Sequence, residues 1–333
     1  MRDPSVGADL RAVIRSQLTL PAICAPMFLV SGPELVAAAC KAGLVGALPR
    51  QNARTVEEFE GWLRDIRVEL DAFADANPDA PIGPLAVNMA TRFDDAELNR
   101  HLDLCSRYGA TIVISAQGNP AELAKRVHDW GGAIFHDVTS LRFAEKAIEA
   151  GVDGLNCIGA GGGGHSGTMS HLVMIPKIRS MFDGVIVLAG AVSNGAVIRA
   201  AEVLGADLSY LGTRFIATRE SRASDEYKAM LVRGGADDLI YTADIAGVAA
   251  NWMVESIRAV GLDPSNLPKP PDGRMGYGHL PAEVKPWKNL FSAGQGMALI
   301  DDIPSVAELV GRLRDEYVDA CATPDMANAA ARR

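Results

Sequence analysis

The sequence predicts an α/β fold, a (β/α)8 TIM barrel that carries a C-terminal helical cap. Short apolar runs alternate with amphipathic segments over residues 22–217, and eight such runs occur. Eight parallel strands are the number that closes a barrel of this kind. The runs are continuously apolar, which is typical of parallel strands that are buried on both faces. We therefore expect a barrel core at residues 1–218 and a second region at 219–333 packed on it.

The elements follow in order along the chain. The expected strands are 22–27, 45–48, 82–89, 111–115, 133–138, 154–158, 185–190 and 208–217. The expected helices between them are 33–42, 56–72, 96–108, 121–130, 140–150, 170–181 and 194–204. Several of these helices end in glycine just before the next strand, as at Gly43, Gly109, Gly151 and Gly205. Glycine accepts the left-handed conformation that closes a helix, so these positions mark the boundaries.

The region 219–333 is expected to hold the final barrel helix and a cap. Two further helical stretches are predicted there, at 245–260 and 305–320. A Pro/Gly-rich segment, 263–279, lies between them. A segment of that length without periodic structure usually covers a site, so we expect a lid or a covering loop.

Composition and charge narrow the class of protein. The 333 residues are 48% hydrophobic and 22% charged, which is typical of a soluble globular chain. The net charge is −9 and no long Lys/Arg block occurs, so neither nucleic acid nor an anionic membrane is expected as a partner. The N-terminus has no apolar core of signal-peptide length, and no apolar run is long enough to span a bilayer. These features predict a cytoplasmic protein that acts on a small molecule. The sequence is compatible with a homo-oligomer.

Five cysteines are scattered along the chain, at positions 24, 40, 105, 157 and 321. Their number is odd, and no pair has the spacing of a metal site. We expect reduced thiols and no metal.

Barrel enzymes place their active sites at the carboxyl ends of the strands, which turns the strand order into a list of candidate residues. The loops after the last two strands commonly bind phosphate, because backbone N–H groups face the anion there. The candidates for that phosphate site are Ala189, Gly190, Ala191, Gly212 and Thr213. The candidates after earlier strands are Ala25, Pro26, Met27, Asn88 and Asp137, with His136 beside it.

The segment 159–167, Gly-Ala-Gly-Gly-Gly-Gly-His-Ser-Gly, follows the sixth strand. Gly162, Gly163 and Gly164 expose backbone that suits a flat or charged ligand. His165 is the lone imidazole of this loop and the candidate base. The glycines at 159, 161 and 164 also spell the dinucleotide fingerprint G-x-G-x-x-G. That fingerprint should open a helix early in a doubly wound domain, whereas here it follows a sixth strand, so we favour the catalytic loop.

Taken together, these motifs resemble the FMN-dependent nitronate monooxygenases, formerly called 2-nitropropane dioxygenases. The resemblance runs from about residue 21 to residue 317. Its motifs are Ala-Pro-Met at 25–27, Val-Asn at 87–88, Gly-Gly-His-x-Gly at 163–167, Ala-Gly-Ala at 189–191, Gly-Ala-Asp at 205–207, Leu-Gly-Thr-Arg-Phe at 211–215 and Ser-Ala-Gly-Gln-Gly at 292–296.

The resemblance implies an FMN cofactor in the barrel core, 1–218, and assigns roles to the candidates. Ala25, Pro26 and Met27 would lie against the isoalloxazine ring, with Asn88 and Gly163 touching it. Gly190, Ala191, Gly212 and Thr213 would hold the FMN phosphate, and His165 would be the base near flavin N5. The expected FMN-binding set is completed by Asp137, Gly162, Gly164 and Ala189.

Two positions depart from the pattern of the family. Ile158 stands where its members often carry Gln or Asp, and Asp137 stands where a polar or basic flavin contact is common. The substrate and the electron donor therefore stay open. The leading hypothesis is oxidation of an alkyl nitronate by FMN and O2 to a carbonyl compound and nitrite. The alternative is an NAD(P)H-dependent reductase of a quinone or an enoyl thioester carried by CoA or ACP.

A third hypothesis is a flavin-free barrel that binds a phosphorylated ligand.

Several other side chains have structural interpretations. We expect His171 at a helix N-terminus, Cys157 inside a buried strand, and Ser193 and Asn194 as helix N-cap candidates. Arg214 and Arg219 fit structural ion pairs as readily as ligand contacts. The aromatic residues Tyr241, Trp252 and Trp287 are interpreted as packing residues that stay candidates for the pocket wall.

Overall fold

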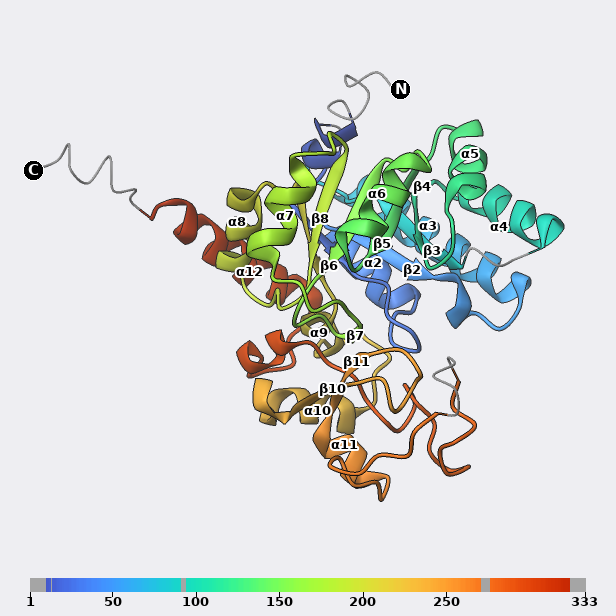
Figure 1. The fold of residues 1–333 in the computed structure, drawn as a ribbon. Coiled ribbons are helices and arrows are strands. Elements are labelled where there is room, and N and C mark those ends of the chain that lie inside the picture. The colour runs from blue at the N-terminus through green and yellow to red at the C-terminus, as the bar shows by residue number, and fades with distance from the viewer. Residues whose placement is uncertain (1–9, 13, 91–93, 271–275, 324–333) are drawn as a thin grey trace, which may run out of the picture.

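The computed structural model of this chain describes residues 10–12, 14–90, 94–270 and 276–323. Eight parallel strands close a barrel, which confirms the predicted fold class (Figure 1). The last strand pairs with the first, with Ala22 opposite Ser209. In order around the barrel the strands are β1 (Ala22–Cys24), β2 (Val45–Pro49), β3 (Leu85–Ala90), β4 (Ala110–Ala116), β5 (Ala133–Val138), β6 (Gly154–Ile158), β8 (Val185–Ala189) and β9 (Leu208–Leu211).

Helices follow the strands and cover the outside of the barrel. They are α2 (Pro33–Lys41), α3 (Val56–Ala76), α4 (Asp95–Arg107), α5 (Ala121–Asp129), α6 (Leu141–Glu149), α7 (His171–Arg179) and α8 (Gly195–Leu204). Most begin at a polar residue whose side chain accepts a hydrogen bond from the first turn, as Asn194 does from the Val197 N–H at 2.9 Å. Gly205 closes α8 with φ at 105°, a left-handed conformation that glycine adopts without strain.

The barrel interior is filled by apolar side chains, and a second apolar layer lies between the strands and the helices. Phe135 of β5 is fully buried in the interior. A Cβ atom at Gly154 on the neighbouring strand would lie 2.5 Å from the Phe135 ring. The missing side chain at Gly154 therefore makes room for the aromatic ring, and the interior is a packed core below the mouth.

The helix that completes the outer ring comes from the end of the chain. After β9 only the short helix α9 (Thr213–Ile216) follows, and α12 (Val306–Cys321) packs against α8 and α2. Glu316 of α12 accepts a hydrogen bond from the Gly195 N–H at 2.7 Å. A Cβ atom at Gly195 would lie 2.1 Å from the Leu313 carbonyl oxygen, so the two helices meet backbone to backbone. The helix predicted at 305–320 is thus confirmed, with Ser305 as its N-cap.

The chain between α9 and α12 gathers over the carboxyl ends of the barrel strands (Figure 1). It contains α10 (Asp225–Arg233), β10 (Leu239–Thr242), β11 (Ala250–Met253) and α11 (Val254–Ala259). Strands β10 and β11 form an antiparallel sheet, and its third strand is β7 (Gly164–His165), a piece of the glycine loop. We refer to residues 217–305 as the cap.

Two predicted elements were wrong. The helix predicted at 245–260 is the strand β11 followed by the short helix α11, because the backbone of 250–253 pairs with β10 on one side and β7 on the other. Such pairing overrides a local pattern. The strand predicted at 208–217 ends at Leu211, since Gly212, with φ −102° and ψ −72°, is the N-cap of the helix α9. The cap is therefore a mixture of strands, helices and turns.

The division of the chain at residue 218 stays a prediction. In the segment 263–279, which we expect to cover a site, residues 271–275 lie outside the described residues. Within the described part of that segment, His279 donates from Nε2 to the Asp244 carbonyl at 2.7 Å. The covering role of this segment stays a prediction as well.

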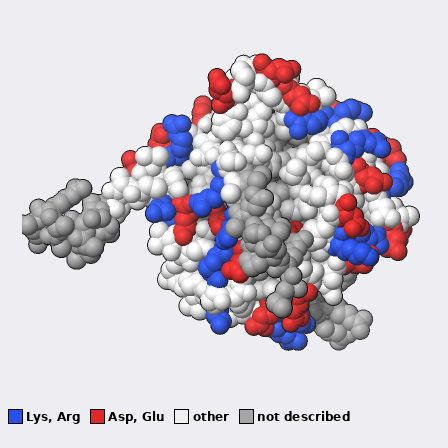
Figure 2. Space-filling model, turned by 90° about the horizontal axis from the view of Figure 1, so that it is seen from above, with Lys and Arg blue, Asp and Glu red and all other residues white. Residues whose placement is uncertain are grey.

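Charged side chains of both signs alternate on the face of the barrel opposite the cap (Figure 2). Ion pairs occur at many places on the molecular surface, such as Arg67 with Asp71 at 2.7 Å and Arg126 with Asp95 at 2.8 Å. Exposed pairs of this kind each stabilise the fold by about 0–1 kcal/mol. Among the helices of the described ranges, none has the length and apolarity that a membrane span requires.

Candidate active site

The predicted site residues meet at one cavity at the carboxyl ends of the strands. Its volume is about 1500 Å³. The candidates that line it are Ala25, Pro26, Met27, Asn88, Asp137, Gly162, Gly163, Gly164, His165, Ala189, Gly190, Ala191, Gly212 and Thr213. Six different strands supply these residues or the loops after them, so only closure of the barrel brings them together.

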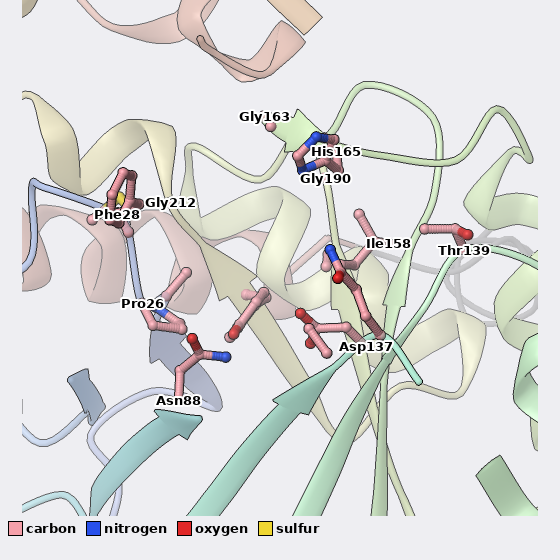
Figure 3. A pocket seen from close by; sticks show the side chains of 18 of the residues that line it. Pro26, Phe28, Asn88, Asp137, Thr139, Ile158, Gly163, His165, Gly190 and Gly212 are labelled. Atoms are coloured by element: carbon pink, nitrogen blue, oxygen red, sulfur yellow. The ribbon is translucent and has the colours of Figure 1, made fainter. Parts of the chain in front are cut away.

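Figure 3 shows how the labelled side chains are arranged around this cavity. His165 and Gly163 lie across from Asp137, which stands at the end of its strand. Pro26 and Asn88 lie on one side, and Ile158 lies on the other side. The cavity thus has a floor on the barrel strands and a roof on the glycine loop.

The loop that carries Pro26 is fixed by two polar side chains. Asn52 donates to the Met27 carbonyl at 3.0 Å, and Ser31 accepts from the Met27 N–H at 3.0 Å. Beside this loop, Asn88 accepts at Oδ1 from Gln51 at 2.9 Å. These bonds leave Pro26 and Asn88 in defined positions at the cavity wall, which is what a rigid binding site needs.

The cap determines where the glycine loop lies. Gly164 and His165 form strand β7, with His165 opposite Ala250 of β11. Ser292 accepts from the Gly164 N–H at 2.8 Å, and Asn251 donates to the Gly162 carbonyl at 2.7 Å. The imidazole is therefore held on a short strand and not on a free loop.

The glycines of this loop have a packing role as well as exposed backbone. A Cβ atom at Gly163 would lie 3.0 Å from the Gly294 N atom, and a Cβ atom at Gly294 would lie 2.7 Å from the Gly161 carbonyl oxygen. Gly161 and Gly164 have φ values of 80° and 70°. The Ser-Ala-Gly-Gln-Gly motif at 292–296 thus lies directly against the glycine loop, a contact that the sequence did not reveal.

His165 has the properties of a neutral base. Burial lowers its pKa from the usual 6.5, so the imidazole is uncharged at neutral pH. Its Nε2 atom is buried and has no hydrogen-bond partner among the described residues. A neutral imidazole with one nitrogen available is suited to accept a proton from a ligand in the cavity.

Trp287 packs against His165 and lines the cavity, so it is one of the packing aromatics that the sequence left as a candidate for the pocket wall. The two ring centroids are 5.7 Å apart in an edge-on arrangement. Trp252 also packs against Trp287, with ring centroids 4.6 Å apart. Trp287 has φ at 70°, which is unusual for a large side chain. Backbone strain of this kind tends to occur at functional sites. No feature of the sequence indicated that this tryptophan would contact the imidazole of His165.

The candidate phosphate site has open backbone and a polar side chain without a partner. Gly190 has φ at 126° and Ala191 has φ at 57°. A Cβ atom at Gly212 would meet only ordinary contacts, the nearest being Met27 Sδ at 3.7 Å, so packing alone does not require glycine there. Ser193 Oγ is buried without a hydrogen-bond partner in the described part of the chain. A phosphate fits this arrangement, since it would supply acceptors to these groups.

Asp137 lies at the floor of the cavity, beside Asn156. Asn156 donates from Nδ2 to Asp137 Oδ1 at 2.8 Å. Burial raises the pKa of Asp137 to about 7, and the hydrogen bond from Asn156 only partly offsets this effect. The carboxyl group is therefore divided between its acid and its anionic form at neutral pH.

The remaining histidine and cysteine candidates have structural surroundings. His136 lines the cavity and bonds at Nδ1 to Ser115 Oγ at 2.8 Å, and burial lowers its pKa to about 4. His171 is the first residue of α7 and donates from Nε2 to the Ala189 carbonyl at 2.8 Å, so its place at a helix N-terminus is confirmed. Cys157 is buried in β6, and burial raises the pKa of its thiol, as expected for an inert strand residue.

The two arginines after β9 form ion pairs. Arg214 is buried and bonds to Asp302 at 2.6 Å, and Arg219 pairs with Glu308. All five cysteines are free. Within the described ranges, no group of three or more acidic, histidine or cysteine side chains is placed to hold a metal ion.

Known proteins resemble this chain over most of its length. The model of the nitronate monooxygenase family matches residues 12–316. A nitronate monooxygenase from Paraburkholderia phytofirmans is 29% identical over 350 aligned positions, which cover 89% of this chain and 92% of that protein. The (3aS,4S,5R,7aS)-5-hydroxy-7a-methyl-1-oxo-octahydro-1H-indene-4-carboxyl-CoA dehydrogenase from Mycobacterium tuberculosis is 25% identical over 68% of this chain, and the match spans only 61% of that relative's length.

Solved structures show the same fold. FabK from Thermotoga maritima superposes with a TM-score of 0.73 at 21% identity, covering 94% of this chain and 96% of FabK. Nitroalkane oxidase from Streptomyces ansochromogenes superposes with a TM-score of 0.69 at 22% identity, covering 92% of this chain and 98% of the oxidase. At these identities the two likenesses establish the barrel and its cap, and the chemistry has to be argued from the cavity.

Proposed function

This chain belongs to the nitronate monooxygenase family, and from that premise we propose that it is an FMN-dependent oxidoreductase whose base is His165. One observation carries the proposal. His165 is a neutral, half-buried imidazole whose buried Nε2 has no hydrogen-bond partner among the residues that the structure describes. It lines the same cavity as the backbone of Gly190, Ala191 and Gly212, the candidates for phosphate binding. Such a reaction requires a proton acceptor and a cofactor-binding site in the same cavity.

The residues present fit the cofactor. Ser193 Oγ and Tyr210 Oη line the cavity and are buried without hydrogen-bond partners among the described residues, so a polar ligand would satisfy them. Gly190, Gly212 and Thr213 would hold the phosphate, and Ala25 to Met27 would lie against the ring system. When bound, FMN would supply the electron transfer, taking two electrons from the substrate and passing them to O2.

The protein would contribute a proton acceptor, a fixed geometry and exclusion of water. His165 would accept the proton of a neutral nitroalkane at Nε2, or would position the nitronate anion. Base catalysis of this kind contributes about 10²–10⁴-fold to the rate. Trp287 would hold the imidazole in place and keep water from it, which preserves the neutral form. The preferred substrate is an alkyl nitronate, a choice supported by the relative that matches over nearly its whole length.

A second candidate is favoured by the size of the cavity. Sites for one ligand of drug size occupy about 300–1,000 Å³, whereas this cavity measures about 1500 Å³. It extends beyond the flavin candidates to Thr139, Phe143 and Lys146. A cavity of this size has room for FMN and a bulky second molecule, such as an acyl thioester with NAD(P)H as the electron donor.

The test is FMN uptake followed by anaerobic reduction of the bound flavin. The purified protein is loaded with FMN and mixed without oxygen with propyl-2-nitronate, NADH or NADPH, and the absorbance of the flavin is followed. Bleaching by the nitronate alone supports the first candidate, and bleaching by NADH or NADPH alone supports the second. A protein that takes up no FMN would refute both and would favour a flavin-free, phosphate-binding barrel.

A further inference from the structure

Three polar side chains form a cluster on the floor of the cavity. Asp137 of β5 and Asn156 of β6 lie opposite each other in the barrel register and are joined by the 2.8 Å hydrogen bond described above. Tyr210 of β9 packs against the apolar interior of the barrel. Asp137 and Tyr210 both line the cavity. The cluster separates the apolar interior of the barrel from the space above it.

The hydrogen bonding of this cluster is incomplete. Asn156 Oδ1 and Tyr210 Oη are buried and have no hydrogen-bond partner among the described residues. Asp137 Oδ2 takes part in no hydrogen bond within the same ranges, since Asn156 contacts only Oδ1. Buried polar atoms in folded proteins nearly always have partners. A ligand with polar atoms along one edge, placed above the floor, would supply partners for Asp137 Oδ2 and Tyr210 Oη, whose side chains line the cavity.

Among the described residues, no positively charged group lies beside Asp137 to offset the negative charge of its ionised carboxylate. On its own strand, His136 is bonded to Ser115 and is kept neutral by burial. Tyr210 of β9 and His165 of β7, which lies across the cavity, are both neutral, because burial raises the pKa of the tyrosine and lowers that of the histidine. The thiols of Cys157 and Cys24 belong to the apolar layer outside the strands and are neutral as well, since burial raises the pKa of each. Lys146 and Glu149 of α6 reach the cavity only from its exposed rim. The pKa of Asp137, raised to about 7, thus reflects burial without a cation to offset it.

We infer that Asp137 contacts the flavin as a carboxylic acid that donates a hydrogen bond, and that loss of this proton lowers the reduction potential of the flavin. The inference rests on the proposed function, because it needs bound FMN. The isoalloxazine ring carries hydrogen-bond acceptors along its pyrimidine edge, and two-electron reduction increases their negative charge. A donor at that edge stabilises the reduced ring, whereas a carboxylate repels it.

Reduction of the ring takes up different numbers of protons on the two sides of the Asp137 pKa. Below that pKa the acid is already protonated, so two electrons enter the flavin with only the protons that the ring itself takes up. Above it, reduction of the ring raises the proton affinity of the carboxylate, which then takes one additional proton from solvent. One additional proton per two electrons steepens the fall of potential with pH by about 30 mV per pH unit. Asp137 would therefore make the flavin a weaker oxidant at alkaline pH.

The experiment measures the equilibrium reduction potential of the FMN-loaded protein from about pH 6 to pH 9. Asp137→Asn is the test variant, because an asparagine there can still accept the bond from Asn156 but cannot titrate. Glu145→Gln is the matched control, since it removes an exposed carboxylate from α6 without touching the cavity.

We expect the wild-type potential to fall more steeply than that of Asp137→Asn above pH 7, by about 30 mV per pH unit. Glu145→Gln should follow the wild type. Parallel curves for wild type and Asp137→Asn would overturn the inference and leave the proposed function intact. If Asp137→Asn fails to fold or to hold FMN, Asp137→Ser takes its place, because serine does not titrate either and the proton uptake of the ring itself cancels in the comparison. Parallel curves for wild type and Asp137→Ser above pH 7 also overturn the inference. Failure of the wild type to take up FMN would instead refute the proposed function.

Discussion

Replacement of His165 by asparagine tests the proposed base directly. The variant keeps a polar side chain of similar size on β7 and removes the proton acceptor, while the backbone pairing with Ala250 stays. Base catalysis contributes about 10²–10⁴-fold. At 1.36 kcal/mol for each factor of ten, this corresponds to about 2.7–5.4 kcal/mol of lost transition-state stabilisation. We expect kcat/KM for a neutral nitroalkane to fall by this factor.

The assay compares two substrates that differ only in one proton. Anaerobic stopped-flow reduction of the bound flavin is followed with nitroethane and with its preformed nitronate. The nitronate has already lost its proton, so His165→Asn should slow it far less than nitroethane. The FMN absorbance of the variant serves as the control for an intact site. An equal loss with both substrates, or no loss with either, would refute the role of His165 as a base.

The pH dependence of the wild type adds a second check on the same residue. Only the neutral imidazole accepts a proton, and burial holds the pKa of His165 below 6.5. The titration of His165 should therefore leave kcat/KM for nitroethane unchanged above pH 6.5. It should lower kcat/KM as the pH drops through the pKa of His165. A limb centred above 6.5 would contradict the burial that we assign to His165.

Three further outcomes are expected. Trp287→Ala admits water to the imidazole that it packs against, so the acidic limb of kcat/KM should move to higher pH, while Trp287→Phe should move it less; an unchanged limb would remove Trp287 from the site. Gly190→Ala places a Cβ atom 3.0 Å from the Gly162 N atom at φ 126°, which should cost about 1–3 kcal/mol of stability and weaken FMN binding in a fluorescence titration. Its matched control, Gly311→Ala in α12, meets no atom within 4 Å and should raise stability by about 0.5–1 kcal/mol. Asp302→Asn leaves the buried Arg214 guanidinium without its carboxylate, which should cost about 1–3 kcal/mol in chemical denaturation; a stability equal to wild type would show that the pair contributes nothing.

The sequence by itself determined the barrel and the end of it at which the site lies. Eight apolar runs, joined by seven amphipathic helices, allow few folds, because parallel strands must be buried on both faces and joined by crossover helices. The carboxyl ends of those strands then share one edge. For this reason the strand order alone assigns residues as far apart as Pro26 and Thr213 to one site, and both line the cavity. Their roles toward FMN stay predictions.

Only the tertiary structure decided how His165 is held. The pairing of β7 with β11 joins the glycine loop to residues 250–253, and the local pattern of 245–260 gives no sign of that strand, because its hydrogen-bond partners lie elsewhere in the chain. Trp287 reaches the imidazole through the same cap. The titration of Asp137 likewise depends on burial and on Asn156 of the neighbouring strand. Position along the chain identifies a candidate residue, whereas its burial, partners and charge are set by the segments that fold around it.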